Sequence, residues 1–92
     1  MSQETLEVKG ENIVEVAKAL SSKTRIQILK MTSEKDIDVS RIAALLNQTE
    51  ANISAQIKIL EDANLLNSRY EPGMHGVRKI CNTKITNVLI KI

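Results

Sequence analysis

The 92-residue sequence predicts a mainly helical α+β domain that carries one small β-hairpin. Apolar residues recur at helical spacing through the first two-thirds of the chain. Two short segments rich in β-forming residues follow, with Pro72 and Gly73 between them. A chain of this length is below the size at which domains divide, so we expect residues 1–92 to form a single domain.

The amino-terminal part of the chain is expected to hold two helices. Residues 1–10 are polar and are predicted to be a frayed lead-in. Over residues 11–20 the apolar side chains fall at the i, i+3, i+4 and i+7 positions of one helical stripe. Ser21 and Ser22 interrupt this stripe and offer N-cap oxygens to a second helix over residues 23–32.

Two further helices are predicted next, joined by a tight turn. Asp38 or Ser40 can cap the first of them. Thr49 is the expected N-cap of the second, which covers about residues 50–63. Asn64 follows, and Asn tolerates the left-handed conformation with which many helices end. This arrangement is a helix–turn–helix.

A β-hairpin is predicted after the helix–turn–helix, with strands over residues 65–70 and 77–82. Pro72 fixes φ and Gly73 supplies a positive φ, which together predict a type II turn. The hairpin would then carry a six-residue loop over residues 71–76.

The last segment, residues 83–92, repeats its apolar residues at helical spacing after a possible cap at Thr83. We therefore predict a fifth helix there. The segment is also rich in β-branched residues, so a strand remains the alternative.

The outward face of the fourth predicted helix carries amide and small side chains. Asn and Gln can form two hydrogen bonds with adenine, and an Ala methyl can contact the thymine methyl. The alternative is a solvated, amide-rich helix face. The candidates for reading bases are Gln48, Ala51, Asn52, Ala55 and Gln56.

Basic side chains flank the predicted hairpin loop, where they can contact phosphates without reading sequence. The hairpin and the helix–turn–helix together predict a winged helix–turn–helix that binds double-stranded DNA. The candidates for contacts with the DNA backbone are Ser40, Arg41, Thr49, Ser54, Lys58, Arg69, Tyr70, His75, Arg78 and Lys79.

Composition limits the classes of function only broadly. The net charge of +2 permits an anionic partner without requiring one. A single cysteine excludes an intrachain disulfide framework, and no apolar run approaches the roughly 20 residues of a membrane span. The polar amino terminus is unlike a signal peptide, so we expect a soluble, cytoplasmic protein.

Two segments, ALSSKTRIQIL at residues 19–29 and NISAQIKILEDANL at 52–65, precede the predicted wing in order. With that wing, the chain resembles an ArsR-type winged helix–turn–helix transcriptional regulator. The resemblance implies a homodimer that binds an imperfect palindrome, with residues 50–63 in the major groove and the wing, residues 71–76, on the backbone or in the minor groove. It also implies dimerisation through residues 11–20 and 83–92, with an interface of Ile13, Val16, Leu20, Ile85, Val88, Leu89 and Ile92.

The chain lacks the metal-sensing motifs of that family. Asp38 and Ser40 stand where many members carry paired cysteines, and thiophilic metals need sulfur ligands. Residues 83–92 contain no Asp, Glu or His, so the ligands of the other common site are missing. We interpret His75 as a solvated wing residue and Cys81 as a small buried hydrophobe, with an intersubunit disulfide as a minor alternative. No metal or cofactor is expected.

No constellation of catalytic residues is found, so an enzyme is not expected. We interpret Arg25 as a structural ion-pair partner and the pair Glu61–Asp62 as solvated charge. Two alternatives to a sequence-specific regulator remain, namely an architectural DNA-binding protein with little sequence preference and a winged helix used as a protein-interaction module. The modest charge and the acidic Glu50 near the predicted DNA face favour the latter.

Overall fold

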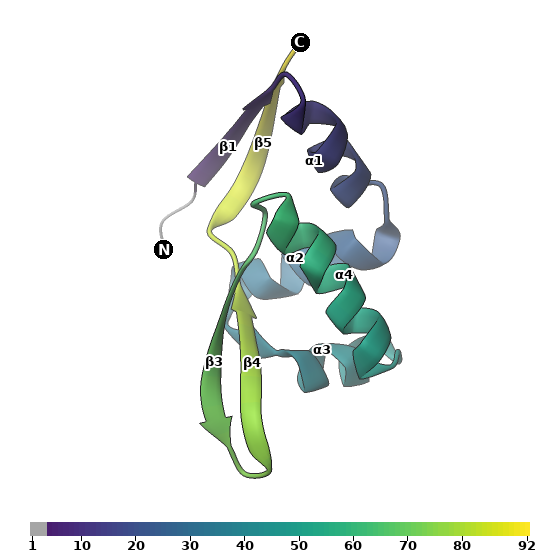
Figure 1. Cartoon of the computed structure of the whole chain (residues 1–92), viewed down its shortest axis with the longest axis vertical. Coiled ribbons are helices and arrows are strands. Elements are labelled where there is room, and N and C mark those ends of the chain that lie inside the picture. Colours follow the sequence, from purple (N-terminus) through teal and green to yellow (C-terminus); the bar gives the residue numbers. More distant parts are fainter. Residues whose placement is uncertain (1–3) are drawn as a thin grey trace.

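The computed structural model describes residues 4–92, which form an elongated body with extents of 46 × 27 × 18 Å. The helices lie in the middle, a hairpin projects at one end, and a two-stranded ribbon with the carboxyl terminus lies at the other (Figure 1). The elements are β1 (Glu4–Lys9), α1 (Asn12–Leu20), α2 (Lys23–Glu34), β2 (Ile37–Asp38), α3 (Val39–Leu46), α4 (Glu50–Asp62), β3 (Asn67–Gly73), β4 (Gly76–Asn82) and β5 (Ile85–Lys91).

Side-chain caps define where three of the helices begin. Ser22, Asp38 and Thr49 each accept a hydrogen bond from the backbone N–H three residues further on, at 3.3, 3.0 and 3.1 Å. The predicted caps are therefore confirmed, and Asp38 rather than Ser40 caps α3. Each such bond satisfies one of the backbone donors that a helix leaves free at its first turn.

Two asparagines in left-handed conformation end the helices of the helix–turn–helix. Asn47 has φ 54° after α3, and Asn64 has φ 60° just after α4. Asn adopts this region more readily than most residues, which is why the chain can turn sharply at both places. The predicted end of α4 at Asn64 is confirmed.

The core is aliphatic and lies between α2, α3 and α4. Ile28 of α2, Ile42 of α3 and Ile53 and Ile57 of α4 are completely buried. Burial of each such side chain contributes about 1.5–3 kcal/mol. This packing fixes which face of α4 is turned inward, and therefore which face it presents to solvent.

The projecting hairpin belongs to a three-stranded antiparallel sheet of order β2-β4-β3. Its ladder continues through Pro72↔Val77 to Gly73↔Gly76, so only two residues form the loop. The predicted six-residue loop and type II turn are wrong, because Pro72 lies on the edge strand, where its missing N–H interrupts no ladder. The glycine with positive φ is Gly76, at 120°, rather than Gly73.

The opposite end of the molecule is a parallel pair of β1 and β5. Leu6 pairs with Val88 and Val8 with Ile90, and Val8 is buried. Residues 4–9 are therefore a strand rather than part of a frayed lead-in, while residues 1–3 of that predicted lead-in lie outside the described residues.

The predicted helix over residues 83–92 is replaced by β5. Thr83 does not cap a helix: its side chain is buried and its hydroxyl oxygen accepts a local bond from the Ile85 N–H at 3.0 Å. β1 provides a partner strand for this β-branched segment, and its side chains alternate between an inner and an outer face. The spacing of residues within 83–92 does not reveal that partner. None of the helices described over residues 4–92 has the length and apolar character needed to span a bilayer.

Candidate nucleic-acid interface

The outward face of α4 is set by the burial of its inward face. Ile53 and Ile57 are completely buried, whereas Ala51, Asn52 and Ala55 are exposed. This matches the predicted assignment of faces. Small side chains beside Asn52 leave room for a flat surface to approach the helix closely.

Three amide side chains on α4 and at its start form one continuous hydrogen-bonded series, which we call the amide chain (Gln48, Asn52 and Gln56). Gln56 Nε2 donates to Asn52 Oδ1 at 3.4 Å, and Asn52 Nδ2 donates to Gln48 Oε1. Both ends are attached to α2. Arg25 Nη1 donates to Gln56 Oε1 at 2.6 Å, and Gln48 Nε2 donates to Thr24 Oγ1 at 3.2 Å. The predicted base-reading amides therefore lie together.

Within residues 4–92, Arg25 is the one cation attached to this series. Its Nε donates to the Ala19 carbonyl at 2.8 Å and its Nη2 to the Lys18 carbonyl at 2.9 Å. Within residues 4–92 no carboxylate forms an ion pair with it, so the expected ion-pair role is wrong. A guanidinium beside the last carbonyls of α1 instead complements the negative end of that helix.

Two wing arginines are paired with carboxylates. Arg69 contacts Asp36 and Glu71, each at 2.7 Å, and Arg78 Nε contacts Asp38 at 3.2 Å. The hydrogen bond to Glu71, together with that to Asp36, raises the pKa of Arg69. Both arginine side chains remain about half exposed, at 45% and 51%. The wing therefore carries exposed guanidiniums that are already neutralised by neighbours.

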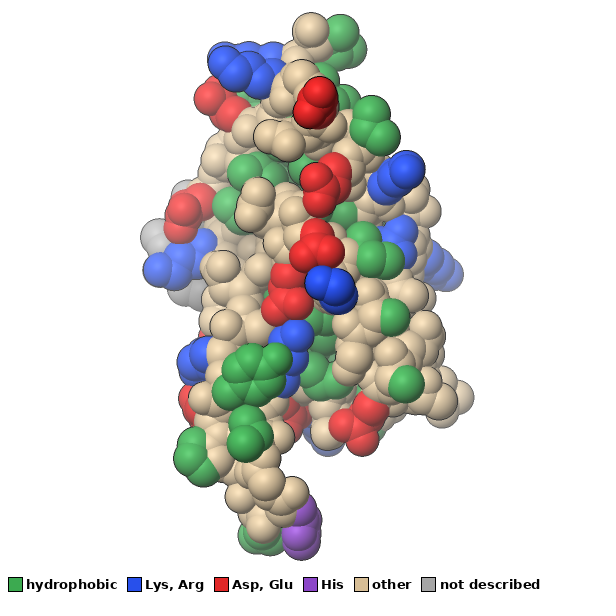
Figure 2. Space-filling model, viewed as in Figure 1, with side chains coloured by type: hydrophobic (Ala, Val, Ile, Leu, Met, Phe, Trp, Pro, Cys, Tyr) green, Lys and Arg blue, Asp and Glu red, His purple; other side chains and the backbone are tan. Residues whose placement is uncertain are grey.

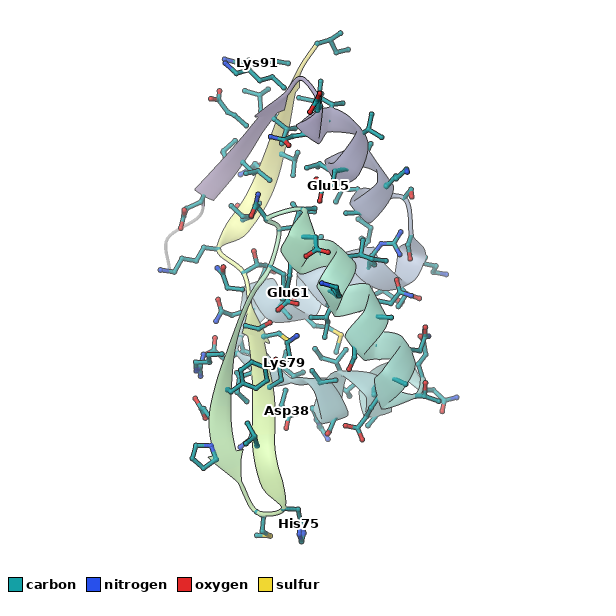
Figure 3. The ribbon with its side chains drawn as sticks, in the orientation of Figure 1. Glu15, Asp38, Glu61, His75, Lys79 and Lys91 are labelled. Atoms are coloured by element: carbon teal, nitrogen blue, oxygen red, sulfur yellow. The ribbon has the colours of Figure 1, made fainter. Side chains whose placement is uncertain are left out.

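Lys79 faces α4. Its Nζ lies 3.2 Å from Glu61 Oε1, and it sits 6.0 Å from the centre of the Tyr70 ring. Figure 3 shows Lys79 between the hairpin and α4, directed toward Glu61. Only 22% and 28% of the two side chains are exposed. Lys79, a predicted contact of the DNA backbone, is thus engaged within the protein, and Glu61 is not solvated charge.

The start of α4 carries a carboxylate near the expected DNA face. Ser40 Oγ donates to Glu50 Oε1 at 2.6 Å, while Thr49 is occupied as the N-cap. Two predicted backbone contacts are thus engaged within the protein. Glu50 lies in the first turn of α4, where the helix dipole favours a negative charge.

The other candidates for backbone contacts are on the surface. Arg41 and Ser54 are exposed, and Lys58 forms only an exposed pair with Asp62 at 3.6 Å. His75 is at the wing tip, away from the helices (Figure 3). These side chains can reach a partner without losing an internal contact of consequence.

The projecting hairpin is also apolar on its surface. Figure 2 shows hydrophobic side chains gathered along it, with basic and acidic side chains interspersed above. Tyr70, Met74 and Val77 are exposed by 69%, 94% and 72%. Of these three side chains, only Tyr70 is predicted from the sequence to contact the DNA backbone. The exposure of Met74 and Val77 depends on the register of the hairpin.

Cys81 is completely buried, and its sulfur lies 3.6 Å from the Ser68 hydroxyl. Burial raises the pKa of this thiol. Its predicted place as a buried hydrophobe is confirmed. No group of three or more His, Cys, Asp or Glu side chains within residues 4–92 is arranged to hold a metal ion.

The predicted dimer residues fall into three groups, which are buried, half-buried and exposed. Val16 is 2% exposed and belongs to the core of the protomer. Ile13, Leu20, Ile85 and Val88 are half-buried, whereas Leu89 and Ile92 are exposed.

An open, mainly apolar groove of about 260 Å³ lies beside the half-buried set. Side chains of α1, α2 and β5 line it, among them Leu20, Ile26, Leu29, Ile85 and Val88. Leu20, Ile85 and Val88 of the predicted dimer interface thus line a groove that a partner molecule can enter.

A helix–turn–helix whose second helix presents an amide face, followed by a hairpin, defines the winged helix–turn–helix class of DNA-binding proteins. The family model for the arsR family of bacterial regulatory proteins matches residues 22–68. The chain therefore belongs to the ArsR family and is a DNA-binding transcriptional regulator. No curated protein matches this chain.

Solved structures share the fold. Fragment 1–100 of a possible transcriptional regulator from Mycobacterium bovis is 24% identical in its crystal structure, with a TM-score of 0.70 over 80% of this chain and 75% of that one. Its solution structure, a homodimeric winged helix–turn–helix DNA-binding domain, gives 24% identity and a TM-score of 0.69 over 80% and 65%. Reduced HlyU from Vibrio cholerae is 21% identical, with a TM-score of 0.68 over 82% and 75%.

Proposed function

We propose that this chain is a sequence-specific regulator that binds double-stranded DNA as a homodimer, with α4 in the major groove and the hairpin on the DNA backbone or in the minor groove. The observation that carries this proposal is the exposed amide face of α4, where Asn52 lies between Ala51 and Ala55. Amides can form paired hydrogen bonds with adenine, and small neighbours allow the close approach that such bonds need.

The wing arginines can contact the DNA backbone if each exchanges a carboxylate partner for a phosphate. Exposed ion pairs contribute at most about 1 kcal/mol, so a phosphate can replace Asp36 or Asp38 at little cost. Arg69 and Arg78 are about half exposed and suit this exchange. Lys79 does not, because its contact with Glu61 braces the hairpin against α4. We therefore assign the phosphate contacts of the wing to Arg69 and Arg78.

The dimer is supported by the homodimeric relative and by the ribbon end of this chain. The β1–β5 pair has only two strands, each with one unpaired edge. Exposed edges favour pairing with another strand, and a two-stranded sheet is marginally stable alone. Val88 and Ile90 lie on the inner face of β5, and Val88 also lines the adjoining apolar groove.

We propose a second copy of this chain as the occupant of that groove, with the two β5 edges antiparallel about a two-fold axis. Such an interface is isologous, since the same patch serves both copies. It places the two α4 helices in symmetric positions, as an imperfect palindrome requires.

Selection of bound duplexes from a random pool tests the function. We expect one enriched sequence with two related half-sites, bound less tightly as salt rises, with a slope of about −0.9 per phosphate contact. A footprint that spreads along DNA without a preferred site would instead support an architectural binder. Failure to bind any duplex at low salt would support a protein-interaction module.

A further inference from the structure

We propose that Arg25 is a positioning residue that sets the direction of the amide chain and thereby the pattern of hydrogen-bond donors and acceptors that α4 offers to base edges. This inference rests on the proposed reading of bases by α4. Arg25 belongs to α2 and lies 31 residues before Gln56 in sequence, so nothing in the local pattern of α4 reveals it.

Arg25 and the three amides differ in the hydrogen bonds that their side chains can form. A guanidinium only donates hydrogen bonds, whereas a primary amide carries both a donor and an acceptor and can turn over. Arg25 Nη1 lies 2.6 Å from Gln56, so the amide oxygen of Gln56 must face it. The amide nitrogen then faces Asn52 and donates to Oδ1 at 3.4 Å.

The direction of hydrogen bonding continues from Gln56 along the helix. Because Asn52 Oδ1 accepts from Gln56, its Nδ2 is turned toward Gln48 and donates to Oε1. Gln48 in turn donates to Thr24 Oγ1 at 3.2 Å. A hydroxyl both donates and accepts, so Thr24 fits either direction of the chain. Arg25 is therefore the end that determines the orientation of all three amides.

The orientation of each amide determines which of its hydrogen-bond donors and acceptors stay free to contact DNA. Each amide of the chain uses one N–H and one oxygen lone pair internally, which leaves one of each. A paired contact with adenine needs one donor and one acceptor, in a fixed order along the base edge. Reversal of the chain would exchange these positions at Asn52, the most exposed amide of the three.

Arg25 is itself held in place from the other side. The carbonyls of Lys18 and Ala19, at the end of α1, accept from Nη2 and Nε at 2.9 and 2.8 Å. Three bonds fix the planar guanidinium, which a lysine ammonium would not reproduce in the same geometry. The end of α1 thus fixes the group that orients the amides of α4.

The first test reads the side-chain amide signals of the free protein by NMR. In Arg25→Met we expect the signals of Gln56, Asn52 and Gln48 all to lose their distinct shifts and their protection from solvent exchange. In the matched control Thr24→Val, at the end that tolerates either direction, only the Gln48 signal should change. A change confined to Gln56 in Arg25→Met would overturn the inference.

A second variant keeps the test decisive if Arg25→Met does not fold. Gln56→Glu retains the acceptor for Arg25 but removes the donor to Asn52. The new carboxylate can accept from Asn52 Nδ2, so the Asn52 amide should turn over, which changes its contacts with neighbouring protons. An Asn52 amide that keeps the wild-type contacts in Gln56→Glu would contradict a chain directed from Arg25.

The DNA test compares discrimination between the selected duplex and duplexes with single base-pair changes. We expect Arg25→Met to lower discrimination at one base pair per half-site about tenfold, within the range of a lost paired base contact. In a Gln56→Ala background the same substitution should have no further effect on discrimination. If Arg25 acted only on stability, Arg25→Met would still lower discrimination in that background. An unchanged preference in Arg25→Met would overturn the inference. A wild type without any preference would refute the proposed function instead, and the NMR result would still decide the role of Arg25.

Discussion

Lys79 Nζ lies 3.2 Å from Glu61 Oε1, and this ion pair joins β4, the middle strand of the three-stranded sheet, to the last turn of α4. Both side chains are less than one-third exposed, so solvent screens the pair less than the other ion pairs of the chain. The pair links the projecting hairpin to α4 within one protomer. The proposed base-reading helix and the proposed wing are thus joined to each other within the protein.

We predict that the Lys79–Glu61 pair contributes measurably to stability. A double-mutant cycle with Lys79→Met and Glu61→Gln, followed by urea unfolding, should give a coupling energy of about 0.5–1 kcal/mol. The control is the Lys58–Asp62 pair, whose side chains are 75% and 57% exposed and whose coupling should be smaller. Equal coupling in the two cycles would show that the hairpin is not braced by Lys79.

Asn52 and Arg78 should affect DNA binding in different ways. Asn52→Ala should reduce discrimination between the selected duplex and its single-base variants by about 1–3 kcal/mol, because a base contact is lost. Arg78→Ala should weaken binding to all duplexes about equally and reduce the salt slope by about 1, because a phosphate contact is lost. Binding isotherms at several salt concentrations separate the two effects. Loss of folding in both variants would mean that the assigned exposed face is wrong.

Thr49 should contribute to stability through its cap. Its hydroxyl oxygen accepts from the Asn52 N–H at 3.1 Å, so Thr49→Ala should lower the free energy of unfolding by about 1 kcal/mol. Thr49→Ser keeps the acceptor and should cost much less. Ser54→Ala, on the exposed face of the same helix, serves as the control and should be nearly neutral. Similar losses in all three variants, measured by urea unfolding, would exclude a capping role.

Burial raises the pKa of the Cys81 thiol, and this predicts a stability effect at high pH. The folded state favours the neutral thiol, so stability is complete below the unfolded pKa. It declines as pH rises toward the folded pKa, because the unfolded state ionises first. The free energy of unfolding should therefore fall more steeply above pH 9 in the wild type than in Cys81→Val. Identical slopes would mean that the thiol ionises equally in both states.

Substitutions on β5 should separate the two faces of the ribbon. Val88 pairs with Leu6 on the inner face and lines the apolar groove, so Val88→Lys should dissociate the proposed dimer. Asn87 lies on the outer face of the same strand, and Asn87→Lys should leave the dimer intact. Sedimentation velocity measures both. A wild-type monomer, or dissociation by Asn87→Lys alone, would contradict an interface at this groove.

Local features of the fold were accessible from sequence because local chemistry determines them. Ser22, Asp38 and Thr49 are capping residues placed immediately before helical spacing begins, and Asn64 is a residue suited to a left-handed helix end. Residues 83–92 could not be assigned in the same way. Their spacing fits a helix and their β-branched residues fit a strand, and the choice depends on β1, some 80 residues away.

The candidate site likewise contains some groups that local spacing places and others that only tertiary packing brings together. Four-residue spacing on one helix is enough to place Gln48, Asn52 and Gln56 together. The contact of Gln56 with Arg25 and the pairing of Arg78 with Asp38 join residues 31 and 40 positions apart. Tertiary packing alone brings these groups together, so the sequence predicts the amides but neither their anchor nor the neutralisation of the wing.

Whether α4 reads the DNA sequence can be decided by one ratio of affinities. The selected duplex and a scrambled duplex of the same base composition are titrated with the wild-type protein at one physiological salt concentration. We predict that the selected duplex binds at least about a thousandfold more tightly, as specific complexes do. Equal affinity for the two duplexes would show that the protein does not read DNA sequence.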